Sequence, residues 1–193
     1  MKTIRFATTN RGKAESMRKV LAPYDIELLQ VDIELPEFRT ADIRMIAEGK
    51  VRFAHEQINM PVIAQDSGFL IFSLNGFPGS FVKFVLETIG LEGLLELMRD
   101  KPRQCEFREA LAYWDGGEDG PIFFEDVIPG FLTEKPRGDL PRDAWSALWL
   151  LFIPEGQKKT LAEMTPEERN QWRDAHARGS EGKFADWIAE RKG

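Results

Sequence analysis

Lys2-Thr-Ile-Arg-Phe-Ala7 is followed by Thr8-Thr-Asn-Arg-Gly-Lys13, and a run of residues with helical spacing begins at Ala14. The first six residues are rich in residues that favour β-structure, which predicts a strand. Met17, Val20 and Leu21 share one face of the following segment, which predicts a helix over 14–21. A strand that leads through a polar turn into a helix is typical of α/β proteins.

The polar turn of this opening unit has the chemistry of an anion site. A helix N-terminus presents backbone N–H groups and a partial positive charge. Thr8, Thr9 and Asn10 add side-chain donors, and Lys13 adds a point charge in the first turn. The spacing is not that of a Walker A loop. The alternative is that Asn10 only caps the helix while Lys13 is solvated.

Outward from this unit, strand and helix patterns continue along the whole chain. Apolar and β-rich runs predict strands, and helical spacing or capping residues predict helices. Strands are expected at 26–31, 61–64, 69–74, 105–114, 122–127 and 145–153. Helices are expected from a Thr40 cap, at 81–87 and 91–98, from Thr165 and at 184–188. We see no internal repeat or long linker, so we expect one α/β domain over 1–193 with a mixed sheet.

Composition narrows the function classes. The 193-residue chain carries a formal net charge of −6, which disfavours a general nucleic-acid binder but not a small nucleotide ligand. One cysteine and two histidines leave carboxylates as the expected metal ligands. No apolar run approaches the ~18 residues of a membrane span, and the N-terminus lacks the pattern of a signal peptide. We therefore expect a cytoplasmic protein with no membrane partner.

Two acids and one lysine follow the predicted strands and turns. Asp66 comes directly after an apolar strand, where α/β sheets commonly bind ligands. Glu37 lies in a loop that Pro36 stiffens, and its interest depends on pairing with Asp66. A glycine- and proline-rich turn over 75–80 leads into a helix that carries Lys83. Each feature also has an ordinary structural reading, as a turn residue or a solvated side chain.

Together these segments resemble the Ham1 family of inosine/xanthosine triphosphate pyrophosphatases, in family order and at family-like spacing. The resemblance runs from residue 3 to about 130 and again over 152–171. The matching segments are Thr9-Asn-Arg-Gly-Lys13-Ala-Glu15, Leu35-Pro-Glu37, Asp66-Ser-Gly-Phe69, Asn75-Gly-Phe-Pro-Gly-Ser-Phe-Val-Lys83-Phe, Phe152–Met164 and Thr165–Asn170.

The resemblance implies a fold and a reaction. The fold would be the two-lobed α/β fold of Ham1- and Maf-type proteins, with a long mixed sheet and the triphosphate in the cleft between the lobes. The enzyme would cleave a nucleoside triphosphate between the α and β phosphates and release the monophosphate and pyrophosphate. It also implies a homodimer, which apolar segments such as Phe81–Leu86 would support.

The resemblance also implies roles for individual residues. Glu37 and Asp66 would hold Mg²⁺, and Asp66 would also orient or deprotonate the attacking water. Lys13 would act in catalysis, at the end of a phosphate cradle formed by residues 8–13. Ser67 and Lys83 would make further contacts to the substrate.

The chain departs from the family in the region expected to read the base. Where the family carries an aromatic–acid element, this chain has Arg142–Leu151, in which Trp145 or Trp149 either stacks on a base or belongs to the core. Arg169 takes the place of a family lysine and is a candidate for substrate binding. His176 and Arg178 lie near the position of a Ser-His-Arg triplet and are candidates for substrate binding. Inosine and xanthosine triphosphates remain the expected substrates, with a modified purine or a pyrimidine as alternatives.

Two other readings stay open. The first is a nucleotide-binding protein that does not hydrolyse its ligand; paired carboxylates beside Lys13 argue against it, because a pure binder has little need of them. The second is a pyrophosphatase of the related Maf type, whose motifs match less well. Magnesium-dependent release of pyrophosphate would distinguish an enzyme from a protein that only binds nucleotides. A substrate panel would distinguish a Ham1-type from a Maf-type pyrophosphatase.

Overall fold

The structure of the protein is a computed structural model that describes residues 2–38, 40–175 and 179–191. The chain divides into two compact units. Unit 1 comprises residues 1–66, 109–126 and 176–193, and unit 2 comprises residues 67–108 and 127–175. The predicted cleft between two lobes stays a prediction.

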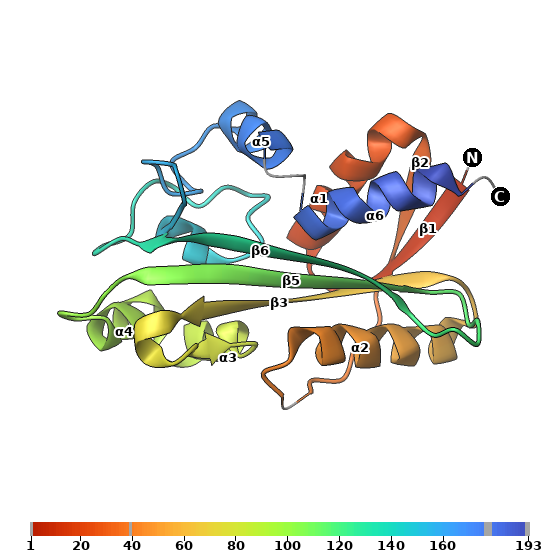
Figure 1. Ribbon diagram of the computed structural model, residues 1–193, viewed down its shortest axis with the longest axis horizontal. Coiled ribbons are helices and arrows are strands. Elements are labelled where there is room, and N and C mark those ends of the chain that lie inside the picture. The colour runs from red at the N-terminus through yellow and green to blue at the C-terminus, as the bar shows by residue number, and fades with distance from the viewer. Residues whose placement is uncertain (1, 39, 176–178, 192–193) are drawn as a thin grey trace. The chain divides into compact units, whose positions relative to one another are not determined.

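The chain combines strand–helix units with a β-hairpin and pairs of consecutive helices, in keeping with the predicted α/β class (Figure 1). The strands are β1 (Lys2–Ala7), β2 (Ile26–Val31), β3 (Val62–Ile71), β4 (Pro78–Gly79), β5 (Gln104–Trp114), β6 (Ile122–Leu132) and β7 (Phe152–Pro154). The α-helices are α1 (Arg11–Leu21), α2 (Ile43–Ile58), α3 (Val82–Thr88), α4 (Gly90–Leu97), α5 (Pro166–Ala175) and α6 (Gly179–Glu190). Three short 3₁₀ segments are η1 (Ala22–Tyr24), η2 (Phe72–Leu74) and η3 (Ala147–Leu150).

The strands of the described chain form one mixed sheet of seven, in the order β2-β1-β3-β5-β6-β7, with β4 paired to β3. β1 runs parallel to β2 and to β3, whereas β4 and β7 run antiparallel to their neighbours. The register places Phe6 of β1 beside Ile63 of β3. The turn that leads to Lys13 follows the carboxyl end of β1, whereas Asp66 lies within the parallel strand β3.

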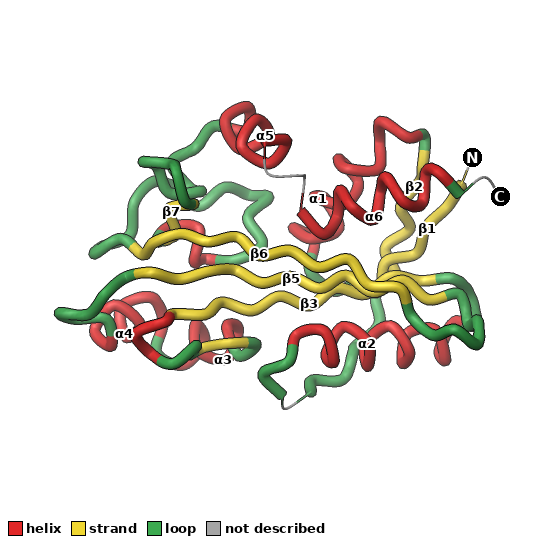
Figure 2. Tube along the Cα trace, in the orientation of Figure 1, coloured by secondary structure: helices red, strands yellow, loops and turns green. Residues whose placement is uncertain are grey.

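In unit 1 the strands are covered by helices on both faces. Figure 2 shows α1 and α6 on one face and α2 on the other. Phe6, Met17 and Phe184, which come from β1, α1 and α6, are fully buried in one cluster. On the other face, α2 packs through an apolar stripe. Its buried residues, among them Ile43 and Ala47, recur at helical spacing.

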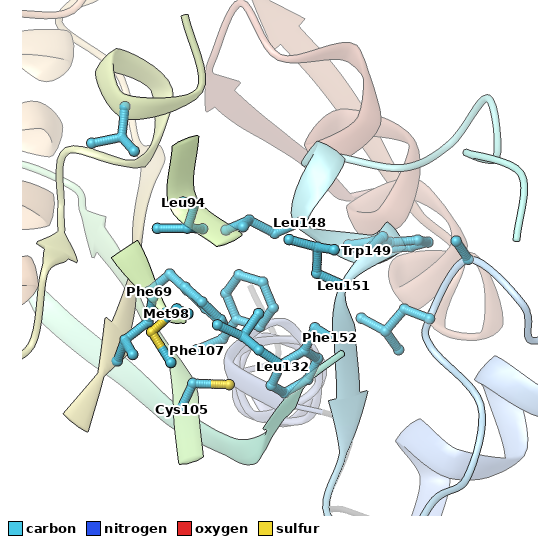
Figure 3. Packing of buried hydrophobic residues seen from close by; sticks show 14 of the residues in the cluster. Phe69, Leu94, Met98, Cys105, Phe107, Leu132, Leu148, Trp149, Leu151 and Phe152 are labelled. Carbon is cyan, nitrogen blue, oxygen red and sulfur yellow. The ribbon is translucent and has the colours of Figure 1, made fainter. Parts of the chain in front are cut away.

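Unit 2 has an apolar core of its own (Figure 3). Phe69, Phe107 and Phe152 from three strands meet there, with ring centroids 4.6–5.9 Å apart. Leu94 of α4 completes the core from the helical side. Cys105 is also buried in this core, as the sequence analysis expects, and burial raises the pKa of its thiol.

Two predicted boundaries are wrong. The strands expected at 61–64 and 69–74 are one continuous strand, β3, so Asp66-Ser67-Gly68 is not a turn. The strand expected at 145–153 is a 3₁₀ helix, η3, followed by the short strand β7. The Ser146 side chain caps η3 by accepting a hydrogen bond from the Leu148 backbone at 3.2 Å. An apolar run alone does not distinguish a buried strand from a buried helical turn.

Helix caps define where the helices begin. Asp42, rather than the expected Thr40, is the N-cap of α2 and accepts a hydrogen bond from the Met45 backbone. Thr165 and Glu168 bond each other's backbone N–H groups and form the capping box of α5. The last helix, α6, is longer than the predicted 184–188 segment. Within the described ranges, no helix combines the length and apolarity that a membrane crossing needs.

Candidate active site

The first part of the candidate site is the turn between β1 and α1. Asn10 caps α1, since its side-chain oxygen accepts a hydrogen bond from the Lys13 backbone N–H at 3.1 Å. Thr8 is buried, and its hydroxyl accepts from the Asn10 backbone N–H at 3.1 Å, which stiffens the turn. Thr9 is exposed at the tip. The positive end of the α1 dipole and the Lys13 side chain thus lie next to a turn that these two hydrogen bonds hold in place.

The second part is a buried ion pair. Lys50 of α2 donates to Asp66 Oδ1 of β3 at 2.5 Å, and both side chains are close to nine-tenths buried. Lys50 lies in the apolar stripe of α2, among residues that face the sheet. A lysine at such a position requires a partner, because an unpaired buried charge is strongly unfavourable. The pair holds one oxygen of Asp66 in place.

Lys13 lies in the electrostatic field of this pair. Removal from water lowers the pKa of its ammonium group, whereas the negative charges of Asp66 and Glu109 partly restore it. Lys50 lowers the pKa further, because it carries a like charge. Two lysines and two carboxylates are therefore gathered within unit 1. A desolvated ammonium of this kind interacts more strongly with a phosphate than a solvated one does.

A third element, α6, is tied to the same region of unit 1. Ser180 is fully buried and donates to Glu109 Oε2 at 3.0 Å. Gln65, the neighbour of Asp66 on β3, donates through Nε2 to the Ser180 hydroxyl at 3.4 Å. Its other amide atom, Oε1, is buried without a hydrogen-bond partner among the described residues. An orphaned buried acceptor is uncommon and is often found at functional sites.

The expected metal ligands are only partly assembled. Asp66 is buried, and Glu37 is exposed in the connection from β2 to α2 of the same unit. In the ranges that the structure describes, no three His, Cys, Asp or Glu side chains are grouped closely enough to hold a metal ion. The chemistry of the two carboxylates nonetheless fits Mg²⁺, which commonly takes one or two carboxylates and fills its remaining positions with phosphate oxygens and water.

The remaining predicted contacts belong to unit 2. Ser67 follows Asp66 on β3 and is partly buried, and Lys83 is exposed on α3. Trp145 is partly buried and packs edge-on against Phe107, with ring centroids 4.9 Å apart. Trp149 is buried in the unit 2 core. Of the two roles predicted for it, this position favours a core residue over one that stacks on a base.

Arg169 lies in the interior of unit 2. Its guanidinium donates to the carbonyl oxygens of Leu161 and Met164, lies 3.7 Å from Asp143 Oδ1 and stacks over the Trp149 ring at 5.4 Å. These contacts give Arg169 a structural role whether or not it also touches a base. The other two candidates, His176 and Arg178, lie outside the described residues.

Two charged residues of the site were missed by sequence reasoning. The signal for Lys50 was present: it stands seven residues after Ile43, on the face of the helix that is otherwise apolar. Glu109 gave a weaker signal, as an acid in an apolar strand between Phe107 and Leu111. A charged residue on the apolar face of a helix or strand indicates a paired or functional group.

Comparison with known proteins identifies a family and related enzymes. The model of the Ham1 family matches residues 4–178. The chain is 36% identical over 184 residues to the dITP/XTP pyrophosphatase of Methanopyrus kandleri, covering 95% of this chain and 94% of that protein. It is 34% identical over 186 residues to the dITP/XTP pyrophosphatase of Thermococcus kodakarensis, covering 96% of each.

Solved structures agree on the fold. The Staphylococcus aureus Ham1 protein superposes with a TM-score of 0.80 at 21% identity, covering 99% of this chain and all of the other. A HAM1 protein from Coxiella burnetii gives a TM-score of 0.77 at 23% identity, covering 98% of each chain. At these identities the likeness concerns the fold.

Proposed function

This chain belongs to the Ham1 family, and from that premise we propose that it hydrolyses non-standard purine nucleoside triphosphates, such as dITP and XTP, to the monophosphate and pyrophosphate. The observation that carries the proposal is the Lys50–Asp66 ion pair beside the desolvated Lys13. The curated relatives named above carry the name dITP/XTP pyrophosphatase, which supports the same substrate class.

Lys13 and the N-terminus of α1 bind the triphosphate. Phosphoryl transfer is accelerated chiefly by positioning the phosphates and by neutralising the charge that develops on their oxygens. The rigid turn held by Thr8 and Asn10 aims the helix dipole at the phosphates, and the Lys13 ammonium supplies a full positive charge there. Ser67 and Lys83 provide further polar contacts to the substrate.

Asp66 orients the attacking water and accepts its proton. Lys50 holds Oδ1, so Oδ2 is the oxygen that receives the water's hydrogen bond. The water attacks the α-phosphorus, and pyrophosphate leaves with the electrons of the broken P–O bond. Lys13 stabilises the negative charge on the phosphates as that bond breaks.

Mg²⁺ is the metal that the reaction uses. Glu37 and Asp66 would hold it, in keeping with the oxygen-rich chemistry of these two side chains. When bound, the ion supplies positive charge that neutralises the phosphates and polarises the scissile bond. The remaining steps belong to Lys13, Lys50 and Asp66.

Base selection belongs to the part of the chain that departs from the family. Trp145 offers an aromatic surface in unit 2, next to Phe107. Arg169 acts on the base indirectly, because its guanidinium is engaged by backbone carbonyls. His176 and Arg178 follow α5 and remain the proposed polar contacts to the purine.

The protein forms a homodimer through α3. Phe81, the N-cap residue of α3, and Phe84 within the helix are 45% and 65% exposed, an unusual exposure for two large apolar side chains three residues apart. We place the dimer in the cytoplasm, in keeping with a single, unpaired cysteine.

A substrate panel tests the proposal. Purified protein would be incubated with Mg²⁺ and the triphosphates of inosine, xanthosine and the four standard bases, in ribo and deoxy forms. Pyrophosphate and orthophosphate would be measured separately, with Asp66→Asn as the control. We expect pyrophosphate from the inosine and xanthosine substrates and little from the variant. Tight binding without release of pyrophosphate would instead identify a nucleotide-binding protein.

A further inference from the structure

A close contact links the loop of Glu37 to the helix of Lys50. Phe38, the residue after Glu37, places its ring against the backbone of Gly49 in α2. A Cβ atom added to Gly49 would lie 2.3 Å from Phe38 Cζ and less than 3 Å from both Cε atoms. Real Cβ atoms do not approach other atoms so closely, so the contact exists only because residue 49 is glycine.

Glycine is otherwise an unfavourable choice at this position. Gly49 lies inside a 16-residue helix, where glycine is destabilising relative to alanine because it loses more backbone entropy on folding. No left-handed backbone angle requires it there. The ring of Phe38 is therefore the feature that accounts for the missing side chain.

The contact connects the two carboxylates of the proposed metal site. Glu37 is adjacent to Phe38, Gly49 is adjacent to Lys50, and Lys50 binds Asp66 at 2.5 Å. Pro36 fixes the backbone angle on the other side of Glu37. The exposed Glu37 thus stands between a stiff residue and an anchored one, on a connection that runs from Val31 to the Asp42 cap.

We propose that Phe38 and Gly49 form a clasp that positions Glu37 for the metal and triphosphate. Both are positioning residues, because they act through Glu37 and touch no reacting atom. The proposal rests on the proposed function only for what Glu37 does; the clasp itself is a property of the protein without substrate.

Gly49→Ala tests the clasp because we expect it to maintain or increase stability while it impairs the use of Mg²⁺. The added methyl group displaces the Phe38 ring, while alanine favours the helix. We expect an unfolding midpoint equal to or above that of the wild type. We also expect the Mg²⁺ concentration for half-maximal hydrolysis to rise on the order of tenfold to a hundredfold, since small displacements of a catalytic group have effects of that size.

Two further variants complete the test. Phe38→Ala removes the ring and should reproduce the phenotype of Gly49→Ala. The double variant Phe38→Leu/Gly49→Ala replaces the ring with a smaller side chain that has room beside the new methyl group, and should recover most of the metal affinity. Glu56→Ala, at an exposed position of the same helix, is the matched control and should behave as the wild type.

Hydrogen–deuterium exchange of the protein without substrate gives a readout that is independent of activity. Exchange over residues 32–38 should be faster in Gly49→Ala and Phe38→Ala than in the wild type or in Glu56→Ala. Unchanged exchange together with unchanged metal dependence in Gly49→Ala would overturn the clasp. A wild-type protein that releases no pyrophosphate would refute the proposed function, and the exchange measurement would still decide on the clasp.

Discussion

Individual charged residues account for most of what unit 1 can do chemically. Lys50 and Asp66 are each other's counter-ion, and Lys13 stays close to them at the expense of its own hydration. We expect such an arrangement to favour an incoming polyanion, because desolvation lowers the pKa of Lys13 and a nearby phosphate would stabilise its charged form. Single substitutions at these residues should therefore affect activity and stability to different degrees.

The ion pair is the first place to look for this separation. Removing either partner leaves the other charge buried and unpaired, so Lys50→Met and Asp66→Asn should each lower the free energy of unfolding by about 3 kcal/mol. Urea denaturation at neutral pH measures this loss. Both variants should also lose pyrophosphate release when they are assayed well below their melting temperatures. Full stability in Lys50→Met would mean that the pair is weaker than its geometry indicates.

Lys13 should behave in the opposite way. Burial lowers its pKa from the ordinary value of 10.5, so between the two values the unfolded chain binds more protons than the folded one. The cost of burying the charge is therefore fully present at lower pH and is relieved as the pH rises towards 10.5. Lys13→Gln should be at least as stable as the wild type at neutral pH, with a stability difference that shrinks at alkaline pH.

Urea titrations of both proteins at several pH values measure this difference. Deprotonation of Lys13 should also limit catalysis. Because kcat/KM reports the ionisation of the free enzyme, it should fall at alkaline pH as Lys13 loses its proton. A difference in stability that does not change with pH would contradict the lowered pKa.

At the scale of single elements, Asn10 caps the N-terminus of α1, and we propose that it also lies at the phosphate-binding site. Asn10→Ala removes the cap and should cost about 1 kcal/mol of stability. Asn10→Asp keeps the cap and suits the helix dipole, but it places a negative charge where the phosphates bind. It should therefore preserve the unfolding midpoint and raise KM for the triphosphate. An Asn10→Asp variant with wild-type KM would place the phosphates elsewhere.

The elements also show what the sequence could and could not predict. β1, α1, β2 and the hairpin of β5 and β6 follow from local periodicity, and the structure confirms them. The segment 145–153 does not, because its apolar residues serve two buried backbone conformations equally well. The structure shows Ser146 as the cap of η3, and a serine in an apolar run is a weak signal in the sequence.

The candidate site was partly readable from sequence for a similar reason. Lys13 lies in the first turn of a helix and Asp66 follows a short apolar run in β3, and both local patterns are informative. Lys50 and Glu109 acquire their meaning from neighbours that are distant in sequence, since Lys50 pairs with β3 and Glu109 with α6. The Phe38–Gly49 contact is likewise visible only when the β2–α2 connection has folded back on its helix.

At the scale of the whole molecule, the exposed apolar face of α3 determines the expected assembly. Phe84→Glu places a charge in the centre of the proposed dimer interface and should give a monomer in sedimentation-velocity experiments. Met45→Glu is a matched control, since Met45 is 60% exposed on α2 and lies in unit 1. A wild-type protein that sediments as a monomer at micromolar concentration would contradict the dimer.

The position of bond cleavage tests the central claim most directly. Hydrolysis of inosine triphosphate would be carried out in ¹⁸O-labelled water with Mg²⁺, and the products analysed by mass spectrometry. Attack of the Asp66-bound water on the α-phosphorus predicts the label in inosine monophosphate and none in pyrophosphate. Label in pyrophosphate, or orthophosphate as the first product, would contradict the account.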